Sequence, residues 1–189
     1  MPHALVIGGT GMLRGASLEL ARRGHDVSVV ARSHARLSEL AHAGASTRGR
    51  IHPTPADYTD TQPFAAALRT AMIARGPFDL AVCWVHSTAP QAVGLIARFM
   101  ERESSATPRR LVHILGCEAD HPEDAMRTRP MIAPTPGVQV TRVVLGFVVE
   151  GQASRWLTHE EICAGVIEAI DAVPETHTIG QTRPWSMRP

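Results

Sequence analysis

Residues 5–15 read Leu5-Val6-Ile7-Gly8-Gly9-Thr10-Gly11-Met12-Leu13-Arg14-Gly15. The stretch begins with a short apolar run containing β-branched side chains, which predicts a buried parallel strand. Glycines follow at once, and residues 16–23 (ASLELARR) then show the spacing of an amphipathic helix, with Leu18 and Ala21 inward. Strand, glycine turn and helix in this order open a βαβ unit of the kind that binds dinucleotides.

The glycines of this turn have separate physical roles. Gly8 permits the tight turn off the strand, and Gly11 has no Cβ, so a pyrophosphate can approach the backbone. The helix N-terminus then presents free N–H groups and a partial positive charge to the phosphates. A bound dinucleotide is the favoured interpretation, and a turn without a ligand is the alternative. The residues expected to contact the dinucleotide here are Gly8, Gly9, Thr10, Gly11, Met12, Leu13 and Arg14.

The glycine turn resembles the cofactor turn of the short-chain dehydrogenase/reductase superfamily, in its extended or atypical branches. The pattern there is Gly-x-x-Gly-x-x-Gly, and Gly8 and Gly11 match its first two glycines. Arg14 stands at the third position, with Gly15 one place late, so we expect Arg14 to reach toward a phosphate instead. The resemblance implies an α/β fold, with a doubly wound, mostly parallel, Rossmann-like sheet in a single domain over residues 1–189.

Composition limits the class of protein. The chain has 189 residues, enough for a sizeable core, and its 44% hydrophobic content argues against disorder. A net charge of +1 argues against a nucleic-acid surface, and no apolar run is long enough to span a membrane. A first strand that starts by Ala4 leaves no room for a signal peptide, and the scattered cysteines indicate free thiols. We expect a cytoplasmic homo-oligomer that binds a small-molecule substrate, without nucleic-acid or membrane partners.

Arg32 and Ser33 follow the second predicted strand, residues 26–31 (DVSVVA). A domain that prefers NAD usually has an acidic residue about 20 positions past the glycine turn, where it bonds the ribose 2′-hydroxyl. Arg32 occupies that place, with Ser33 beside it and Arg36 one helical turn on. A guanidinium can bind a 2′-phosphate through two hydrogen bonds, so NADP is favoured over NAD. The alternative is that Arg32 and Arg36 only solvate the start of a helix over residues 35–43, which Ser33 would cap.

Asp57 and Tyr58 follow the third and weakest strand, which Pro53 and Pro55 confine around Ile51. In the superfamily that this chain resembles, the third strand leads into an Asp whose side chain meets the adenine, and Asp57 fits this place. The alternative is an Asp that forms a turn before the next helix. Tyr58 would lie beside it, near the adenine end of the cofactor.

Strands and helices alternate as far as the fifth strand. Residues 78–85 (FDLAVCWV) are almost continuously apolar and predict a central strand, and residues 109–115 predict the next one. Helices are expected over residues 62–74, capped by Thr61, and over residues 91–102. This alternation predicts a parallel sheet whose ligands bind beyond the carboxyl ends of its strands. The groups that should therefore converge along one edge are the glycine turn, Arg32, Asp57, His86 and Cys117.

The pattern changes after the fifth strand. A proline-rich loop is expected over residues 117–137, with room for at most one short helix near residues 122–127, because each proline removes a hydrogen-bond donor. The acidic residues around His121 match no known metal-site spacing, so we expect a solvated loop and no metal. Residues 138–149 (VQVTRVVLGFVV) predict a single sixth strand.

The C-terminal segment, residues 158–189, begins with the sequence Thr158-His159-Glu160-Glu161, which is a capping box. It predicts a helix that ends at Ala172, followed by a short strand over residues 176–179. This helix–strand segment also resembles the last part of the superfamily's fold.

The usual catalytic residues of that superfamily are missing from this sequence. They are a Ser and a Tyr-x-x-x-Lys motif on the helix after the fifth strand, in which the Tyr passes the proton and the Lys lowers its pKa. All 19 basic residues of this chain are arginine, and its one tyrosine, Tyr58, lies elsewhere. The proline-rich loop takes the place of the helix, and Gly116-Cys117 takes the place of the Ser. The usual mechanism therefore cannot operate.

His86 and Ser87 are the catalytic candidates, because they follow the fourth strand, where the nicotinamide should be close. A neutral histidine can donate or accept a proton near neutral pH, and the alternative is that His86 caps the next helix or bonds a loop carbonyl. Cys117 and His113 are expected to be packing residues. Two functions remain open. One is an NADPH-dependent reductase of a small C=O, C=N or C=C substrate, and the other is a non-catalytic NADP(H)-binding redox sensor or partner subunit.

Overall fold

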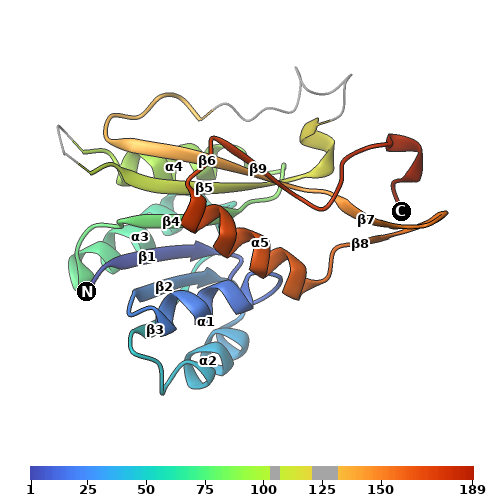
Figure 1. The fold of residues 1–189 in the computed structure, drawn as a ribbon. Helices are drawn as coiled ribbons and strands as arrows, with labels where there is room; N and C mark the ends of the chain where they lie inside the picture. Colours follow the sequence, from blue (N-terminus) through green and yellow to red (C-terminus); the bar gives the residue numbers. More distant parts are fainter. Residues whose placement is uncertain (103–106, 121–131) are drawn as a thin grey trace.

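Across residues 1–102, 107–120 and 132–189, which the computed structural model describes, the chain forms one seven-stranded sheet with the order β3-β2-β1-β4-β5-β6-β9 (Figure 1). Every neighbouring pair in this sheet is parallel. The strands are β1 (His3–Ile7), β2 (Asp26–Ala31), β3 (Arg50–Pro55), β4 (Leu80–Trp84), β5 (Arg109–Gly116), β6 (Val138–Leu145) and β9 (Thr176–Ile179). Because all of them run the same way, their carboxyl ends lie at one edge, as the alternation predicts.

The strand order reverses beside β1. From β1 the chain moves outward to β2 and β3, and it then crosses back to β4 on the other side of β1. In open α/β sheets a ligand binds in the crevice that such a reversal leaves beyond the carboxyl ends. The glycine turn leaves β1 at this point, so the topology places it where a dinucleotide would lie.

Helices cover both faces of the sheet (Figure 1). One face packs against α1 (Arg14–Arg22), α2 (His34–Ala43) and α5 (His159–Ala172), and the other packs against α3 (Thr61–Arg75) and α4 (Gln91–Phe99). The central strands β1, β2, β4 and β5 are mostly buried on both sides, and all five residues of β1 are buried. This two-sided burial explains why the strands read as apolar runs instead of alternating patterns.

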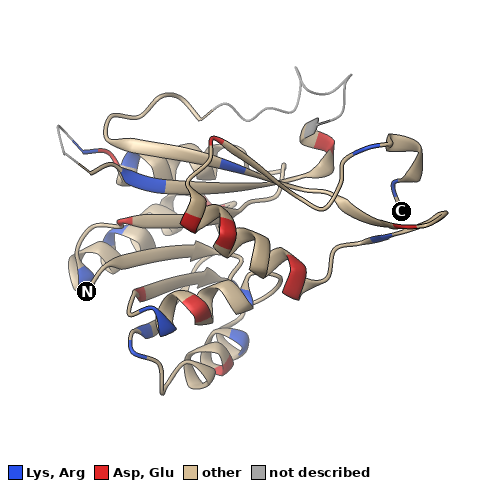
Figure 2. Ribbon diagram, in the orientation of Figure 1, with Lys and Arg blue, Asp and Glu red and all other residues tan. Residues whose placement is uncertain are grey.

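Helices α1 and α5 lie side by side and are joined by an exposed ion-pair network. The Arg23 guanidinium donates to both carboxylate oxygens of Asp171, at 2.6 and 3.1 Å, and to Glu19 at 3.0 Å. Figure 2 shows acidic residues along α5 and both signs of charge along α1. Exposed pairs of this kind contribute only about 0.2–1 kcal/mol each, so the apolar contact between the two helices holds them together and the charges orient them.

The third strand forms in spite of its two prolines. Pro53 and Pro55 lie inside β3, which pairs only with β2 among the described strands and therefore sits at the edge of the sheet. Proline cannot donate to a ladder, and an edge strand has one side on which no donor is needed. The weak sequence signal at Ile51 thus marks an edge strand.

The prediction of one strand over residues 138–149 is wrong. The strand breaks at Gly146, so that β6 ends at Leu145 and β7 (Phe147–Glu150) turns away to pair with β8 (Ala153–Trp156) in an antiparallel hairpin. A Cβ at Gly146 would collide with the backbone of Gln181, which crosses there. The next residue, Phe147, exchanges backbone hydrogen bonds of 2.9 and 2.8 Å with Gln181. A segment distant in sequence therefore ends the strand.

Helix boundaries also differ from the predictions, and α1 runs over Arg14–Arg22 instead of residues 16–23. Thr61 is the first residue of α3, and Asp60 takes the cap position without a side-chain hydrogen bond. Helix α4 ends at Phe99 instead of Arg102, because the Arg102 N–H donates to the Pro136 carbonyl at 3.1 Å and leaves the helical path. In contrast, the Ser33 cap of α2 and the capping box of α5 are confirmed, with Glu161 N–H donating to the Thr158 hydroxyl at 3.2 Å.

The short helix predicted near residues 122–127 and the acidic residues around His121 lie outside the described residues. The described part of the loop begins with the 3-10 helix η1 (Cys117–Asp120), and a second one, η2 (Trp185–Met187), follows β9. None of the helices in the described ranges is long and apolar enough to cross a lipid bilayer.

Candidate functional site

The turn after β1 has the backbone conformation that its first glycine makes possible. Gly8 has φ = +84°, in the left-handed region that other residues rarely adopt. Its N–H donates to the Val30 carbonyl at 3.3 Å, which ties the turn to β2, and its own carbonyl accepts from the Gly11 N–H at 3.2 Å. The tight turn that the sequence predicts at Gly8 is therefore present.

Close packing of α1 against β2 beneath the turn depends on Gly9. The Gly-x-x-Gly-x-x-Gly pattern gives this role to its third glycine. A Cβ at Gly9 would lie 2.5 Å from Ser17 Oγ and 2.8 Å from Val29 Cγ1, so only glycine fits between α1 and β2. Gly15 instead faces α5, where a Cβ would lie 3.0 Å from Cys163 Sγ. The late glycine thus allows two helices to approach, and Gly9 allows the helix to approach the strand.

Gly11 faces open space. A Cβ at this position would meet only the Gly8 carbonyl oxygen within 4 Å, at 3.8 Å, and the residue is exposed. The helix that follows has no side-chain cap, since its N-cap residue is Leu13, and Arg14 stands exposed as its first residue. An uncapped helix N-terminus behind an open glycine is the arrangement that receives a phosphate group. The residues present therefore fit a dinucleotide's pyrophosphate.

A cavity of about 460 Å³ adjoins the turn between the first turns of α1 and α5. The Cys163 thiol on its wall donates to the Met12 carbonyl at 3.0 Å, so α5 supports the glycine turn directly. Burial raises the pKa of this thiol above its ordinary value, which keeps it protonated and able to donate. The cavity is lined by Gly11, Met12, Arg14, Gly15, Glu19, His159, Glu160, Cys163, Ala164 and Ile167.

Arg32 and Asp57 approach each other beyond the ends of β2 and β3. Arg32 is exposed, and its charge contributes to a lowered pKa of the Asp57 carboxyl, after the larger effects of two hydrogen bonds from Thr59. In those bonds Asp57 Oδ1 accepts from the Thr59 N–H at 2.9 Å and from its hydroxyl at 2.7 Å. Asp57 thus forms a turn before α3 and Arg32 is accessible, while the contacts of both residues with a cofactor stay predictions. Ser33 accepts from the Arg36 N–H at 3.3 Å as the cap of α2.

Tyr58 lies against the loop that follows β4. Its hydroxyl oxygen accepts a hydrogen bond from the His86 N–H at 3.4 Å, although the two residues are 28 positions apart. The sequence predicts Tyr58 near the adenine end and His86 near the nicotinamide, and the structure brings the two residues into contact. His86 and Ser87 are exposed, and the Thr88 hydroxyl lies 3.5 Å from His86 Nδ1. The imidazole is thus open to solvent and to a ligand.

Trp84 belongs to this edge but was not singled out from the sequence. It is the last residue of β4, and its Cβ and Cδ1 lie 3.6 Å from the position that a Cβ on Gly8 would occupy. The indole therefore stands beside the glycine turn, on the face of the sheet that α1 covers. The available signal was a large aromatic residue at the carboxyl end of the strand next to β1.

Cys117 and His113 are packing residues, as predicted. Cys117 is 2% exposed, and burial and the Glu118 carboxylate raise the pKa of its thiol, with Arg188 opposing them. His113 is 3% exposed in the middle of β5, and burial, together with the nearby charge of Arg142, lowers its pKa to about 4. Neither group carries a charge near neutral pH, and neither is a candidate for proton transfer at the surface.

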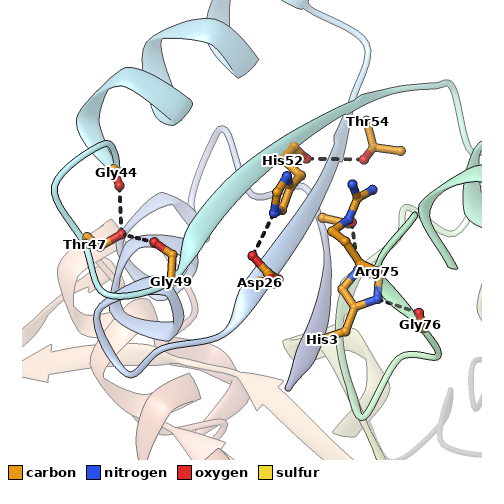
Figure 3. Close-up of polar contacts among 10 residues, drawn as sticks. His3, Asp26, Gly44, Thr47, Gly49, His52, Thr54, Arg75 and Gly76 are labelled. Atoms are coloured by element: carbon orange, nitrogen blue, oxygen red, sulfur yellow. Dashed lines mark hydrogen bonds and ion pairs between the residues drawn. The ribbon is translucent and has the colours of Figure 1, made fainter. Parts of the chain in front are cut away.

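A second polar grouping lies at the opposite, amino-terminal edge of the sheet (Figure 3). His3 Nδ1 lies 2.8 Å from the Gly76 carbonyl and Nε2 lies 2.9 Å from Ser28 Oγ, which also accepts from Arg75 Nε at 3.2 Å. A neutral His3 that donates from Nδ1 satisfies all of these bonds, and burial lowers its pKa accordingly. Ser28 is completely buried, so this Ser–His pair holds three elements together and is no nucleophile.

No protein-family model matches this sequence, and no curated protein matches it significantly. Solved structures do match, and they give the chain the Rossmann-type fold of the short-chain dehydrogenases/reductases. A short-chain dehydrogenase/reductase from Serratia marcescens has a TM-score of 0.75 at 18% identity, covering 95% of this chain and 96% of its own.

The descriptions of two further neighbours name a bound ligand or a kind of substrate. A short-chain dehydrogenase from Burkholderia cenocepacia, solved in complex with NADP, has a TM-score of 0.73 at 17% identity and covers 95% of this chain and 96% of its own. A bulky-bulky ketone specific alcohol dehydrogenase from Comamonas testosteroni has a TM-score of 0.70 at 17% identity, covering 98% of this chain and 89% of its own. At these identities the likeness concerns the fold.

Proposed function

We propose that the chain is an atypical short-chain dehydrogenase/reductase, an NADPH-dependent reductase of a small molecule with a C=O, C=N or C=C bond. The observation that carries this proposal is the glycine turn at the point of strand reversal, open at Gly11 and followed by an uncapped helix. Gly11 is exposed, and its φ is one that other residues can adopt. A turn that only joined a strand to a helix would therefore not need a glycine at this position. The space at Gly11 therefore favours a ligand.

The position of Arg32 supports NADP as the cofactor. Its exposed guanidinium follows β2 at the site where an acidic residue would select NAD, and its charge reaches Asp57 across the adjacent loop. A 2′-phosphate would compete with Asp57 for this guanidinium and would gain charge-assisted hydrogen bonds. NADP bound to a neighbour of the same fold agrees with this choice.

The chemistry would be hydride transfer from the reduced nicotinamide, which the cofactor supplies. What this chain must add is a proton and the alignment of the two reactants. His86 is exposed at the carboxyl end of β4, so its imidazole can take a proton from solvent and donate it to a substrate atom. Tyr58 fixes the backbone of this loop through its hydroxyl, and the sequence contains no lysine that could act with it. We therefore assign proton donation to His86 and loop positioning to Tyr58.

A second candidate is a non-catalytic NADP(H)-binding sensor. The absence of lysine from the sequence favours it, because the pair that carries catalysis in the resembled superfamily cannot form. The two functions share the same cofactor site, and they differ only in turnover. Homo-oligomer formation remains a prediction for either function.

Titration calorimetry with NADPH and NADH tests the cofactor assignment. NADPH should bind more tightly, and Arg32→Ala should weaken NADPH about tenfold to a hundredfold, equal to roughly 1.5–3 kcal/mol, with little change for NADH. Arg22→Ala is the matched control, since Arg22 is an exposed arginine on α1 that pairs with Glu19 at 3.2 Å. Equal affinities for the two cofactors in the native protein would contradict the assignment.

Turnover then separates the two functions. The protein is mixed with NADPH and a panel of small ketones, aldehydes, imines and enones, and the absorbance of the reduced nicotinamide is followed. Consumption of NADPH with any of them identifies a reductase. Tight binding of NADPH without consumption across the panel supports the sensor instead.

A further inference from the structure

Residues 181–188, called here the strap, cross the carboxyl edge of the sheet after β9. The strap starts at the backbone pair between Phe147 and Gln181 and passes through η2 to a position between η1 and the β7–β8 hairpin (Figure 1). Gly180, with φ = +76°, directly precedes it. Near its end the strap contacts the hairpin and η1 through the Arg188 side chain.

Arg188 fastens the strap to two separate elements. Its guanidinium carbon lies 5.3 Å from the Trp156 ring centre on the hairpin and 5.2 Å from the Trp185 ring centre on the strap itself. The same guanidinium donates to the Glu118 carboxylate on η1. A flat cation placed between two indoles and paired with a carboxylate forms a latch that draws the strap, the hairpin and η1 together.

The latch lies beside Cys117, the residue that follows β5. Cys117 is 2% exposed although it lies past the end of the strand, and Arg188 comes close enough to hydrogen-bond its thiol. The components of the latch are themselves exposed, with 34% of the Arg188 side chain, 51% of the Glu118 side chain and 47% of Trp156 accessible. Exposed ion pairs and cation–π contacts are individually weak, so such a latch can open without unfolding the sheet.

We propose that the strap is a gate over the carboxyl ends of β5 and β6, and that release of Arg188 from Trp156 and Glu118 opens it. Substrate would enter where the strap now covers Cys117, while the cofactor turn beside β1 stays supported by α5. That this edge is the substrate side rests on the proposed function, whereas the covering of Cys117 does not.

Thiol labelling measures the gate without any need for activity. The protein is treated with a maleimide, and peptide mass analysis follows each cysteine separately in the same sample. Cys83 has no exposure in the core and reports global unfolding, while Cys117 reports the strap. Arg188→Ala should speed the labelling of Cys117 about tenfold and leave Cys83 protected.

The direction of this change distinguishes opening from an electrostatic effect. Arg188 lowers the pKa of the Cys117 thiol, so its removal alone would raise that pKa and slow the reaction of the thiolate. Faster labelling therefore means greater exposure. Arg183→Ala is the matched control, because Arg183 is an exposed arginine of the same strap outside the latch and its loss changes the net charge equally.

A second variant guards against misfolding. Trp156→Ala removes the indole on the hairpin, which is 47% exposed, and should also speed the labelling of Cys117. Unchanged or slower labelling of Cys117 in both variants, with Cys83 protected, overturns the proposal. Equal labelling of Cys83 and Cys117 in both variants overturns it too, since Arg188 and Trp156 would then hold the whole fold.

Kinetics connect the gate to the proposed function. With a substrate in hand, Arg188→Ala should change the KM for that substrate by about threefold or more and leave NADPH affinity within about twofold, because the cofactor turn lies beside β1. If Arg188→Ala speeds the labelling of Cys117 but the native protein shows no turnover, the reductase assignment is rejected and the gate is still supported. If the labelling shows that Arg188→Ala opens the strap but the KM of this variant equals that of the native protein, substrate does not enter at this edge.

Discussion

His113 should make the stability of this fold fall as the solution is acidified. Its folded-state pKa of about 4 lies below the ordinary value of 6.5 because the imidazole is buried in β5 and faces the charge of Arg142. The unfolded chain therefore binds a proton that the folded chain rejects. The contribution of neutral His113 to the free energy of unfolding is therefore fully present above the ordinary pKa, and it is lost as the pH falls from 6.5 toward about 4.

The magnitude follows from the same two values. Each pKa unit corresponds to about 1.36 kcal/mol, so the full difference is about 3 kcal/mol, and about 2 kcal/mol is already lost near pH 5. This is a large share of the roughly 5–15 kcal/mol that stabilises a typical domain. The pKa values of His3 and His25 are lowered by burial as well, so the native protein loses more than this in total.

A variant isolates the contribution of His113. His113→Leu removes the titrating group while leaving an apolar side chain against the α3 and α4 face, and His34→Leu is the control because His34 is exposed on α2. Urea unfolding at several pH values from neutral to about 5 should give a flatter curve for His113→Leu by about 2 kcal/mol, with no such change for His34→Leu. Parallel curves for the native protein and His113→Leu would refute the reasoning.

Three further results are expected. Gly9→Ala should destabilise the fold by about 1–3 kcal/mol in urea unfolding, because its Cβ has no room, whereas native stability would mean that the turn can shift. Gly11→Val should keep native circular dichroism and lose NADPH binding in calorimetry, because its side chain would fill only the ligand's space, and retained affinity would show a purely structural turn. If His86 donates the proton, His86→Ala should lower kcat roughly a hundredfold to ten-thousandfold, whereas the kcat of Tyr58→Phe should stay within about threefold of the native value. An unchanged kcat in His86→Ala would mean that the proton comes from solvent or from the substrate.

Much of the architecture follows from local sequence signals. The bounds of β2 are those that its apolar run predicts, and the capping box at Thr158 sets the start of α5. Both signals act over one or two turns of chain, so the sequence contains them completely. The convergence of the site at one edge also follows, because parallel strands leave no other place for the residues after them.

The features that were missed depend on contacts between distant segments. Gly146 ends β6 because the backbone of Gln181 crosses it, and nothing within residues 138–149 announces that crossing. Glycine motifs likewise do not say which glycine bears a packing contact, and here Gly9 does so in place of the later one. The hairpin β7–β8 had a local signal, the two-residue turn that starts at Gly151 with φ = +66°, which the long apolar run concealed.

The meeting of Tyr58 and His86 could not be read from the chain either. It depends on the position of the loop after β3 relative to the loop after β4. Hydrophobic periodicity predicts helices and strands but not the conformation of loops. The candidate cofactor residues were accessible to prediction because their motif is local. The proposed proton donor, His86, is less accessible to prediction because its surroundings depend on this loop geometry.

The hydrogen bond from Cys163 to the Met12 carbonyl has a consequence for how the protein is made. It joins residues 151 positions apart, so a growing chain can give the glycine turn this support only after α5 has been synthesised. A nascent chain that already contains all the residues proposed to contact the cofactor would still have an unsupported turn. If the turn binds NADPH as proposed, binding during synthesis should therefore begin only after α5 has been made.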